Sequence, residues 1–310
     1  MPAPTSSAPP QIFDRSLHRK RLDRAAAGFP DADFLKRRAA EDAVARLETI
    51  LRDFPLAVDL GARTGVFRQA LEASDAAARV GRLVEADLSL PMLGGRGGAR
   101  LVADEERLPF AAESLDLVVS TLSLHWANDV VGALIQIRRA LKPDGLFIGA
   151  LLGGATLTEL RQSLMAAEAE ILGGAGSRVS PFADAYDAAG LLQRAGFALP
   201  VADVDRVTVR YRHPLMLMAD LRRMGETNVL AERHPKPLTR ALIGRASEIY
   251  LERFAEADGK IPATFEILTL TGWAPHESQQ KPLKPGSAKM RLADALGVEE
   301  VSVPRGDDQP

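Results

Sequence analysis

The sequence predicts an α/β fold built on a doubly wound, mostly parallel sheet, and three observations lead to this prediction. Short apolar runs alternate with helix-like stretches between Leu56 and about Leu152. The runs are rich in Val, Leu and Ile on both faces, as buried parallel strands are. The first run enters a loop with glycines at 61 and 65, which leads into a helix-like stretch. Strands and helices that alternate at this length form a sheet with helices on both faces.

Two helical patterns precede the sheet, at 11–28 and 31–54. In the second, apolar residues such as Leu35, Val44 and Leu47 recur at a spacing of three to four, and Pro55 is expected to end the helix. The five apolar runs that follow are expected to be strands, at 56–60, 81–88, 99–104, 115–121 and 145–152. Between the last two, an amphipathic helix is predicted at 128–145, with Pro-Asp-Gly as its stop.

The pattern beyond Leu152 is less regular. It predicts helices at 156–172, 187–197, 214–225 and 239–254 and strands at 202–213 and 262–273. These two strands bring the expected sheet to seven strands, and the later helices are expected to form a lid over the active face. The predicted organisation is a disordered tail at 1–11, N-terminal helices at 12–54, the sheet domain with its insertions at 55–287 and a loose tail at 288–310.

Composition excludes several classes of function. The 310 residues include 39 Lys and Arg against 41 Asp and Glu, a net charge of -2, which argues against a nucleic-acid partner. The lack of cysteine excludes disulfides, thiolate metal sites and cysteine nucleophiles. The five histidines include no close pair, and no metal site is predicted. The longest apolar run, LFIGALLGGATL, is too short to span a bilayer, the N-terminus lacks a signal pattern, and we expect a cytoplasmic protein.

The residues that end the first strand are candidates for binding a nucleotide-like cofactor. A doubly wound sheet binds its ligand at the carboxyl ends of its strands. Asp59 ends the first strand, and Gly61 and Gly65 follow it. Glycines let the backbone approach a ligand closely, and the next helix presents unpaired N–H groups to it.

Carboxylates follow the second and third strands in the same way. Asp87 stands where a carboxylate accepts hydrogen bonds from ribose hydroxyls. Asp104, with Glu105 beside it, is placed to accept from an adenine amine. Plainer interpretations exist: Asp59 and Asp87 could each cap a helix, Asp87 as the N-cap of LSLPML, and Asp104 could be solvated surface. Three strand-end features in the right order on one sheet favour the cofactor site.

These motifs resemble a known superfamily. DLGARTG, EADLS, VADEERLPF, LKPDGLFIGALLGG and RAGF follow the motif order of class I S-adenosylmethionine-dependent methyltransferases. IFDRSLHRKR, SLHWANDV, MGETN and GWAPHESQQKP are similar to one subgroup, the methyltransferase-like assembly factors of respiratory complex I and their bacterial relatives. The resemblance runs from about Ile12 to Ser287.

The resemblance implies a seven-stranded S-adenosylmethionine-binding fold and an enzyme that hydroxylates an arginine of a complex I subunit during assembly. It implies a protein substrate, no nucleic acid, and membrane contact at most through the partner. Asp59, Asp87, Asp104, Glu105 and the glycine loop would hold the cofactor. Two alternatives stay open: methyl transfer to a small or carrier-bound carboxylic acid, of the malonyl-acyl carrier protein type, and a non-catalytic chaperone with a degenerate cofactor site.

Arg63 departs from the family loop, which resembles Gly-x-Gly-x-Gly where this chain reads Gly61-Ala62-Arg63-Thr64-Gly65. Its side chain could block the pocket, turn its guanidinium toward the cofactor carboxylate, or point to solvent. Because Asp87 and Asp104 remain, we expect cofactor binding to be retained with altered affinity. On this basis, replacing Arg63 by glycine is not expected to tighten binding.

The stretch SLHWAND follows the fourth strand and supplies the catalytic candidates. His125 could serve as a base or hold a substrate group, and Trp126 could wall the pocket and stack on a guanidinium. The plainer interpretation is a loop packed on the sheet, with His125 hydrogen-bonded and Trp126 in the core. The basic residues of FDRSLHRKRLDR are interpreted first as a solvated helix face, and the polar groups of GWAPHESQQKP as a turn or a peptide-recognition surface.

Overall fold

The computed structural model describes residues 11–95, 97–234, 237–280 and 297. The predicted disordered tail at 1–11 lies outside these residues except for Gln11, and the predicted loose tail at 288–310 lies outside them except for Gly297. Met1–Pro275 forms one compact unit and His276–Pro310 a second. All of the sheet belongs to the first unit, which is described first.

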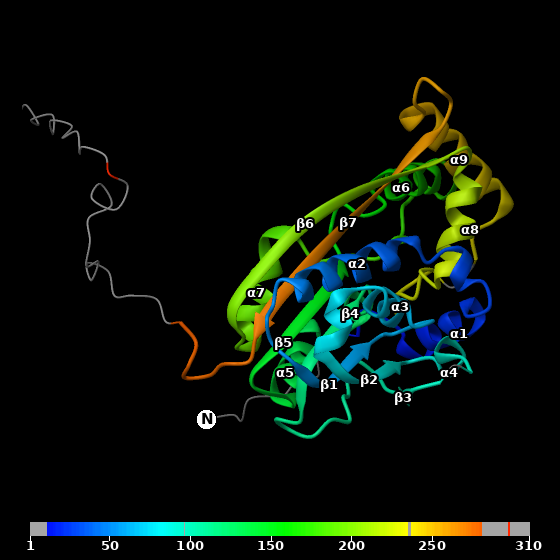
Figure 1. Ribbon diagram of the computed structural model, residues 1–310. Helices are drawn as coiled ribbons and strands as arrows, with labels where there is room; N and C mark the ends of the chain where they lie inside the picture. Colours follow the sequence, from blue (N-terminus) through cyan, green and yellow to red (C-terminus); the bar gives the residue numbers. More distant parts are fainter. Residues whose placement is uncertain (1–10, 96, 235–236, 281–296, 298–310) are drawn as a thin grey trace, which may run out of the picture. The chain divides into compact units, whose positions relative to one another are not determined.

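The seven strands form one sheet in the order β3-β2-β1-β4-β5-β7-β6 (Figure 1). The strands are β1 (Phe54–Leu60), β2 (Val80–Asp87), β3 (Ala99–Val102), β4 (Leu115–Thr121), β5 (Leu141–Leu152), β6 (Ala198–Tyr211) and β7 (Ile261–Trp273). The first five pair in parallel, and β7 pairs antiparallel with both β5 and β6. The expected doubly wound, mostly parallel sheet of seven strands is confirmed.

The first two helices precede the first strand, and the other helices lie between strands along the chain. They are α1 (Arg15–Ala25), α2 (Phe34–Glu48), α3 (Val66–Glu72), α4 (Leu90–Leu93), α5 (Val130–Ala140), α6 (Thr158–Leu172), α7 (Ala185–Ala195), α8 (Pro214–Met224) and α9 (Arg240–Phe254). Short 3-10 turns are η1 (Phe29–Asp31), η2 (Asp75–Arg79) and η3 (Leu124–Trp126).

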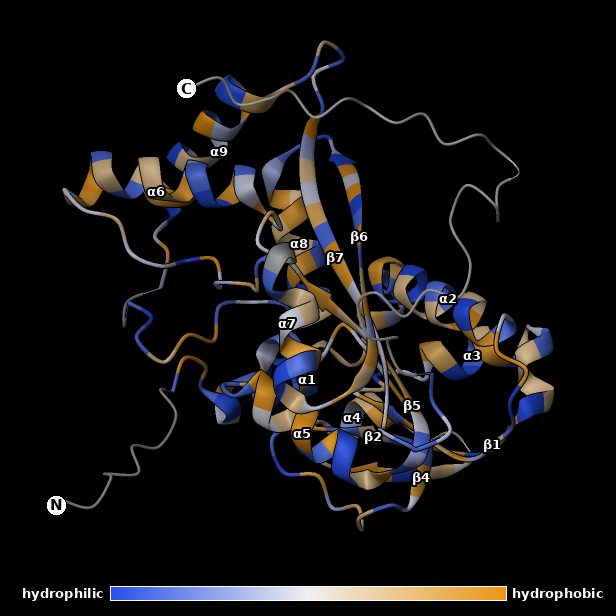
Figure 2. Cartoon of the chain, turned by 90° about the vertical axis from the view of Figure 1, so that its left-hand side faces the viewer, coloured by the Kyte–Doolittle hydropathy of each residue, from blue (hydrophilic) through white to orange (hydrophobic). Residues whose placement is uncertain are grey.

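Two layers of helices cover the parallel part of the sheet. Apolar residues of α2 and α3 pack on one face of β1, β4 and β5, and those of α5 and α7 pack on the other. Figure 2 shows these two pairs of helices on opposite sides of the strands. Because both faces are covered, β4 is buried at every position, which explains its continuous apolar run.

The two antiparallel strands run beyond the parallel ones, side by side, toward α6, α8 and α9 (Figure 1). Their far ends join a separate apolar cluster that includes Leu160 of α6, Leu221 of α8 and Tyr250 of α9. The predicted helical insertions therefore pack as one group at the end of the long strands.

Three boundaries differ from the prediction. The second helix ends at Glu48 and not at residue 54, and Leu51 is 92% exposed. Pro55 does not end the helix but lies in β1, which needs an extended backbone at that point. The Pro-Asp-Gly sequence lies within β5, and α5 ends at Ala140. For Pro55 and for the Pro-Asp-Gly sequence, strand formation determines the backbone conformation where local patterns predict the end of a helix.

Candidate functional site

The glycine loop follows β1 at the carboxyl end of the parallel strands. Gly61, Arg63 and Gly65 all have positive φ, at 76°, 50° and 72°. A β-carbon at residue 61 would lie 2.3 Å from Cβ of Ser123, so this position admits only glycine. Arg63 adopts the left-handed conformation without being glycine, at a cost of about 1–2 kcal/mol. A strained residue at a ligand-binding loop is typical of a functional position.

The Arg63 side chain points inward and pairs with Asp87. Its guanidinium Nη1 donates to Asp87 Oδ2 at 2.8 Å, and its backbone N–H donates to the same oxygen at 2.9 Å. Arg63 is 1% exposed, so the solvent-facing placement is wrong. Burial opposes its charge, but Asp87 and Glu105 outweigh that effect and raise the pKa of Arg63. Its Nη2 is buried with no hydrogen-bond partner among the described residues.

Asp59 lies within the electrostatic influence of a lysine that no sequence pattern had singled out. Lys36 of α2 is buried and donates to Gly61 O at 2.7 Å and to Thr121 O and Oγ1 at 2.5 and 2.8 Å. Both carboxylate oxygens of Asp59 are buried without a hydrogen bond among the described residues. Burial raises the pKa of Asp59 to about 7 against the charge of Lys36. Burial also lowers the pKa of Lys36 to about 8, against the charge of Asp59.

Asp104 and Glu105 are held by the N-terminal helix. Arg15, at the start of α1, donates to Asp104 at 2.7 Å and to Glu105. Glu105 also accepts from Ser123 Oγ and is 1% exposed. The interpretation of Asp104 as plain solvated surface is therefore wrong, and the predicted solvated face of α1 holds for Arg19 but not for Arg15.

The capping interpretations of the other two carboxylates are also wrong. The N-cap of α3 is Gly65, without a side-chain hydrogen bond, so Asp59 caps nothing there. The N-cap of α4 is Ser89, whose hydroxyl accepts from Met92 N. Asp87 instead accepts from Ser89 N through Oδ1.

His125 and Trp126 meet a third side chain at the end of β4. Glu226 Oε2 accepts from Trp126 Nε1 at 2.9 Å and lies 3.3 Å from His125 Nε2. The Trp126 ring packs on Phe13 and on His18, with ring centroids 5.2 and 4.9 Å away. Trp126 therefore packs against His18 of α1, and it also lines the cavity described in the next paragraph.

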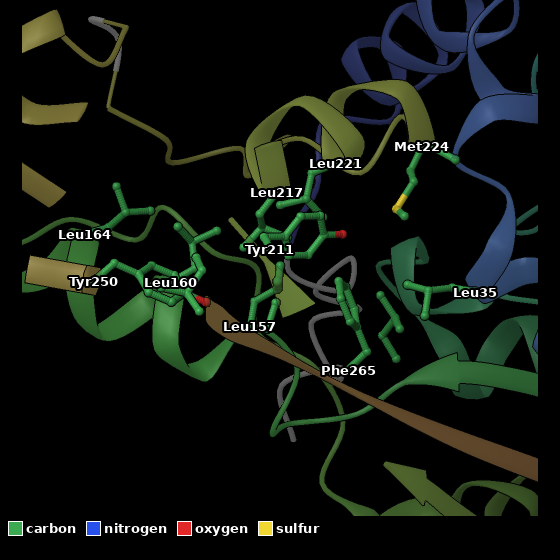
Figure 3. Close-up of a cluster of buried hydrophobic side chains, with 14 of the residues drawn as sticks. Leu35, Leu157, Leu160, Leu164, Tyr211, Leu217, Leu221, Met224, Tyr250 and Phe265 are labelled. Carbon is green, nitrogen blue, oxygen red and sulfur yellow. The ribbon is translucent and has the colours of Figure 1, made fainter. Parts of the chain in front are cut away.

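A cavity of about 520 Å³ opens beside these residues. Lys36, Arg63, Trp126 and Glu226 line it, together with apolar residues from the cluster between α6 and α8. Figure 3 shows part of that cluster, with Leu157 and Leu160 near Tyr211 and Phe265. Ligand pockets in enzymes have about this size, roughly 300–1,000 Å³. The cavity thus has charged side chains, among them Arg63, in a lining that is otherwise mostly apolar, and Asp59, Asp87 and Asp104 do not line it.

Sequence reasoning missed three residues of the site. Glu226 lies in MGETN and Arg15 in IFDRSLHRKR, so both stand within motifs noted for their resemblance. Lys36 has no such signal, because it occupies an ordinary position in an amphipathic helix. His18 is also buried against Trp126, and burial, followed by the charges of Arg63 and Arg15, lowers its pKa well below 6.5.

The described part of the chain contains no group of three or more His, Asp or Glu side chains that could hold a metal ion. No helix there is long and apolar enough to cross a membrane. In the second unit, His276 forms a turn in which Nδ1 lies 2.7 Å from Ser278 Oγ.

Comparisons with known proteins identify the family. A methyltransferase domain family matches residues 58–149. The arginine-hydroxylase NDUFAF5 of Danio rerio is 41% identical over 91% of this chain and 89% of its own length. The human protein of the same name is 40% identical over 97% of this chain and 89% of its own length. The chain belongs to the arginine-hydroxylase NDUFAF5 family. Members named in this way are mitochondrial.

More distant relatives carry a different name. The malonyl-[acyl-carrier protein] O-methyltransferase of Laribacter hongkongensis is 34% identical over 88% of this chain and 94% of its own length. The NDUFAF5 family and these methyltransferases thus share one enzyme fold, and the present chain is an enzyme of this methyltransferase-like type.

Solved structures agree on the fold alone. The YcgJ protein of Bacillus subtilis superposes with a TM-score of 0.51 at 16% identity, covering 77% of this chain and 99% of that one. A phosphoethanolamine N-methyltransferase 2 of Haemonchus contortus, in complex with S-adenosylhomocysteine, gives 0.50 at 17% identity, covering 84% and 60%. Both support the class I methyltransferase architecture for the NDUFAF5 family member described here.

Proposed function

We propose that the protein binds S-adenosylmethionine and hydroxylates an arginine side chain of a protein substrate, a subunit of respiratory complex I, in the cytoplasm. The names of its relatives support the arginine and the hydroxylation. That the substrate is a subunit of complex I is implied by the resemblance of the terminal motifs to the assembly-factor family. The cytoplasmic location is the expectation from the sequence.

One observation in the structure carries the substrate assignment. Glu226 is the only acidic side chain among the described residues that line the cavity, and the other charged side chains there are cationic. A half-buried carboxylate in such a place is suited to a guanidinium, which it binds through charged hydrogen bonds. Because Trp126 and His125 both hold Glu226 Oε2, we assign them as positioning residues for that carboxylate.

The strand-end residues fit the cofactor in part. Asp59 offers two buried oxygens without a hydrogen bond, and the loop approaches closely at Gly61. Asp87 and Asp104 would take the ribose and adenine, but each now accepts from an arginine of this chain. S-adenosylmethionine, when bound, supplies an activated methyl group and a sulfonium charge.

The hydroxylation inserts one oxygen atom into a C–H bond of the substrate arginine. With dioxygen as the oxidant, the second oxygen atom leaves as water, and two electrons and two protons come from an external reductant. In this proposal the chain's own part is to hold the guanidinium on Glu226 and to exclude water from the cavity, whose walls are mostly apolar.

Mass spectrometry of the host's complex I subunits, with and without the gene, tests this proposal. The gene should add the mass of one oxygen atom to an arginine-containing peptide. Glu226→Gln should abolish that mass, and the matched control Glu232→Gln, at an exposed position nearby, should not. A mass gain of one methyl group would instead identify a methyltransferase, and no mass change would identify a chaperone.

A further inference from the structure

The cavity has an apolar part that an arginine substrate would not need. Its apolar walls come from the ends of α2 and β5 and from α6, α8 and β7. They include Leu35, Leu152, Leu157, Leu160, Leu164, Met218, Leu221, Met224 and Phe265. Figure 3 shows most of these side chains gathered around one space, from elements far apart in the sequence. Such walls fit an aliphatic chain.

Three arginines line the same cavity at positions that solvent reaches. Arg21 comes from α1, Arg222 from α8 and Arg233 from the segment after α8. Among the described residues, no carboxylate lies within ion-pairing distance of Arg21 or Arg222. Arg233 reaches Asp14, at 3.4 Å. The lining therefore carries a local excess of positive charge.

The arginines also repel one another. Partial burial, followed by repulsion from Arg24, Arg233 and Arg222, lowers the pKa of Arg21. Its Nε is buried and has no hydrogen-bond partner among the described residues. Like charges that lie close together destabilise the fold unless an anion is bound between them, and within the described part of the chain only Arg233 of the three has a carboxylate within reach. An arginine cluster binds a carboxylate through paired N–H donors.

We propose that the cavity binds a single-chain aliphatic acid, with its carboxylate on Arg21, Arg222 and Arg233 and its chain among the leucines of α6 and α8. The ligand has one anionic group and one unbranched chain, as a fatty acid has. This site lies in the same cavity as Glu226 and goes beyond the proposed hydroxylation, because its contacts are the apolar walls and the three arginines and not Glu226.

Binding of decanoate below its micelle concentration tests the proposal on the full chain. Trp126 lines the cavity, so its fluorescence reports occupancy, and calorimetry measures the affinity. Decanoate should bind at least about tenfold more tightly than decanol, because only the acid gains charged hydrogen bonds. Each added methylene should tighten binding by about fourfold until the cavity is full.

Paired variants separate the charge from the fold. Arg21→Ala with Arg222→Ala should remove the preference for the acid over the alcohol. Arg19→Ala with Arg223→Ala, exposed neighbours on the same two helices that do not line the cavity, should leave the preference intact. The affinities of acids of increasing chain length are measured on the unmodified protein. They therefore test the proposal even if the double variant folds poorly.

Several results would overturn the proposal. The proposal is wrong if acids of no chain length bind, or if the acid and the alcohol bind with equal affinity. It is also wrong if the protein binds only to vesicles of anionic lipid, which would identify a membrane-facing surface. None of these results bears on the mass of the complex I subunit. The proposed hydroxylation therefore stands or falls separately.

Discussion

Replacing Arg63 by glycine should tighten cofactor binding. In the structure the guanidinium donates to Asp87 Oδ2 and so takes an acceptor site that a ribose hydroxyl could otherwise use. Asp87 already accepts three hydrogen bonds, two from Arg63 and one from Ser89, of the four that a carboxylate offers. Glycine at position 63 keeps the hydrogen bond from the backbone N–H to Asp87 Oδ2. It removes the guanidinium, which frees one acceptor site of Asp87 and leaves the negative charge of Asp87 unpaired. The pairing with Asp87 thus reverses the expectation drawn from the sequence.

The magnitude follows from the exchanged bond. A hydrogen bond to a charged group is worth about 1.5–3 kcal/mol, which corresponds to about 10–100-fold tighter binding of S-adenosylhomocysteine. Folding stability should move in the opposite direction. Breaking a buried ion pair costs about 3–5 kcal/mol, and relief of the positive φ returns about 1–2 kcal/mol. We expect a net loss of about 1–4 kcal/mol of unfolding free energy.

Calorimetry with S-adenosylhomocysteine and urea unfolding measure the two effects. Glu113→Gly is a matched control, because Glu113 also has a positive φ, of 53°, but is exposed and away from the loop. It should leave affinity unchanged. In an Asp87→Asn background, Arg63→Gly should lose most of its effect on affinity. Unchanged or weaker binding by Arg63→Gly would show that the unpaired Nη2 contacts the cofactor, and the reasoning from Asp87 would then be wrong.

Three further changes test the charges around the site. Lys36→Met should lower the unfolding free energy by about 3–5 kcal/mol, since it leaves two carbonyls and Asp59 without their cation; urea unfolding at pH 7 measures this loss. The folded pKa of Asp59, about 7, lies above its ordinary 3.8, so this group's contribution to stability is fully present at low pH and is lost as pH rises toward 7. Between pH 4 and pH 7 the unfolding free energy of Asp59→Asn should therefore fall by less than that of the unmodified protein. An equal fall in both proteins would contradict the raised pKa of Asp59. Arg15→Ala should expose α1 to proteolysis and destabilise the fold by about 3–5 kcal/mol, since Glu105 is left buried without its cation, whereas exposed Arg19→Ala should stay within about 0.5 kcal/mol.

The sequence predicted the sheet and the carboxyl-end residues because both depend on local patterns. Buried parallel strands have continuous apolar sequences, and their carboxyl ends lie at the same edge of the sheet however the helices pack. This is why Asp59, Asp87 and Asp104 could be placed on neighbouring strands before their surroundings were known. Their roles in binding the cofactor stay a prediction.

The partners of these residues could not be predicted from the same patterns. Lys36 reaches Thr121 across 85 positions of sequence, and Glu226 reaches Trp126 across 100. Such contacts depend on how α2 and the segment after α8 dock on the sheet, and one sequence holds no periodic signal for docking. The prediction that Pro55 ends a helix failed for a related reason, since the pairing of β1 with β2 begins at Phe54 and makes Pro55 part of a strand.

The arrangement of charge at the strand ends has a consequence for any cofactor that binds there. Asp87 is paired with Arg63, Asp104 with Arg15, and Asp59 interacts with the charge of Lys36. A nucleoside that binds these carboxylates therefore competes with cations supplied by this chain. Because Arg15 begins α1, displacement at Asp104 would also remove one of the contacts that hold this helix, while the contact of Arg15 with Glu105 could remain. Cofactor affinity and the position of the N-terminal helix are thus linked through the ion pair of Arg15 with Asp104, because a ligand group that takes Oδ1 of Asp104 must replace Arg15 there.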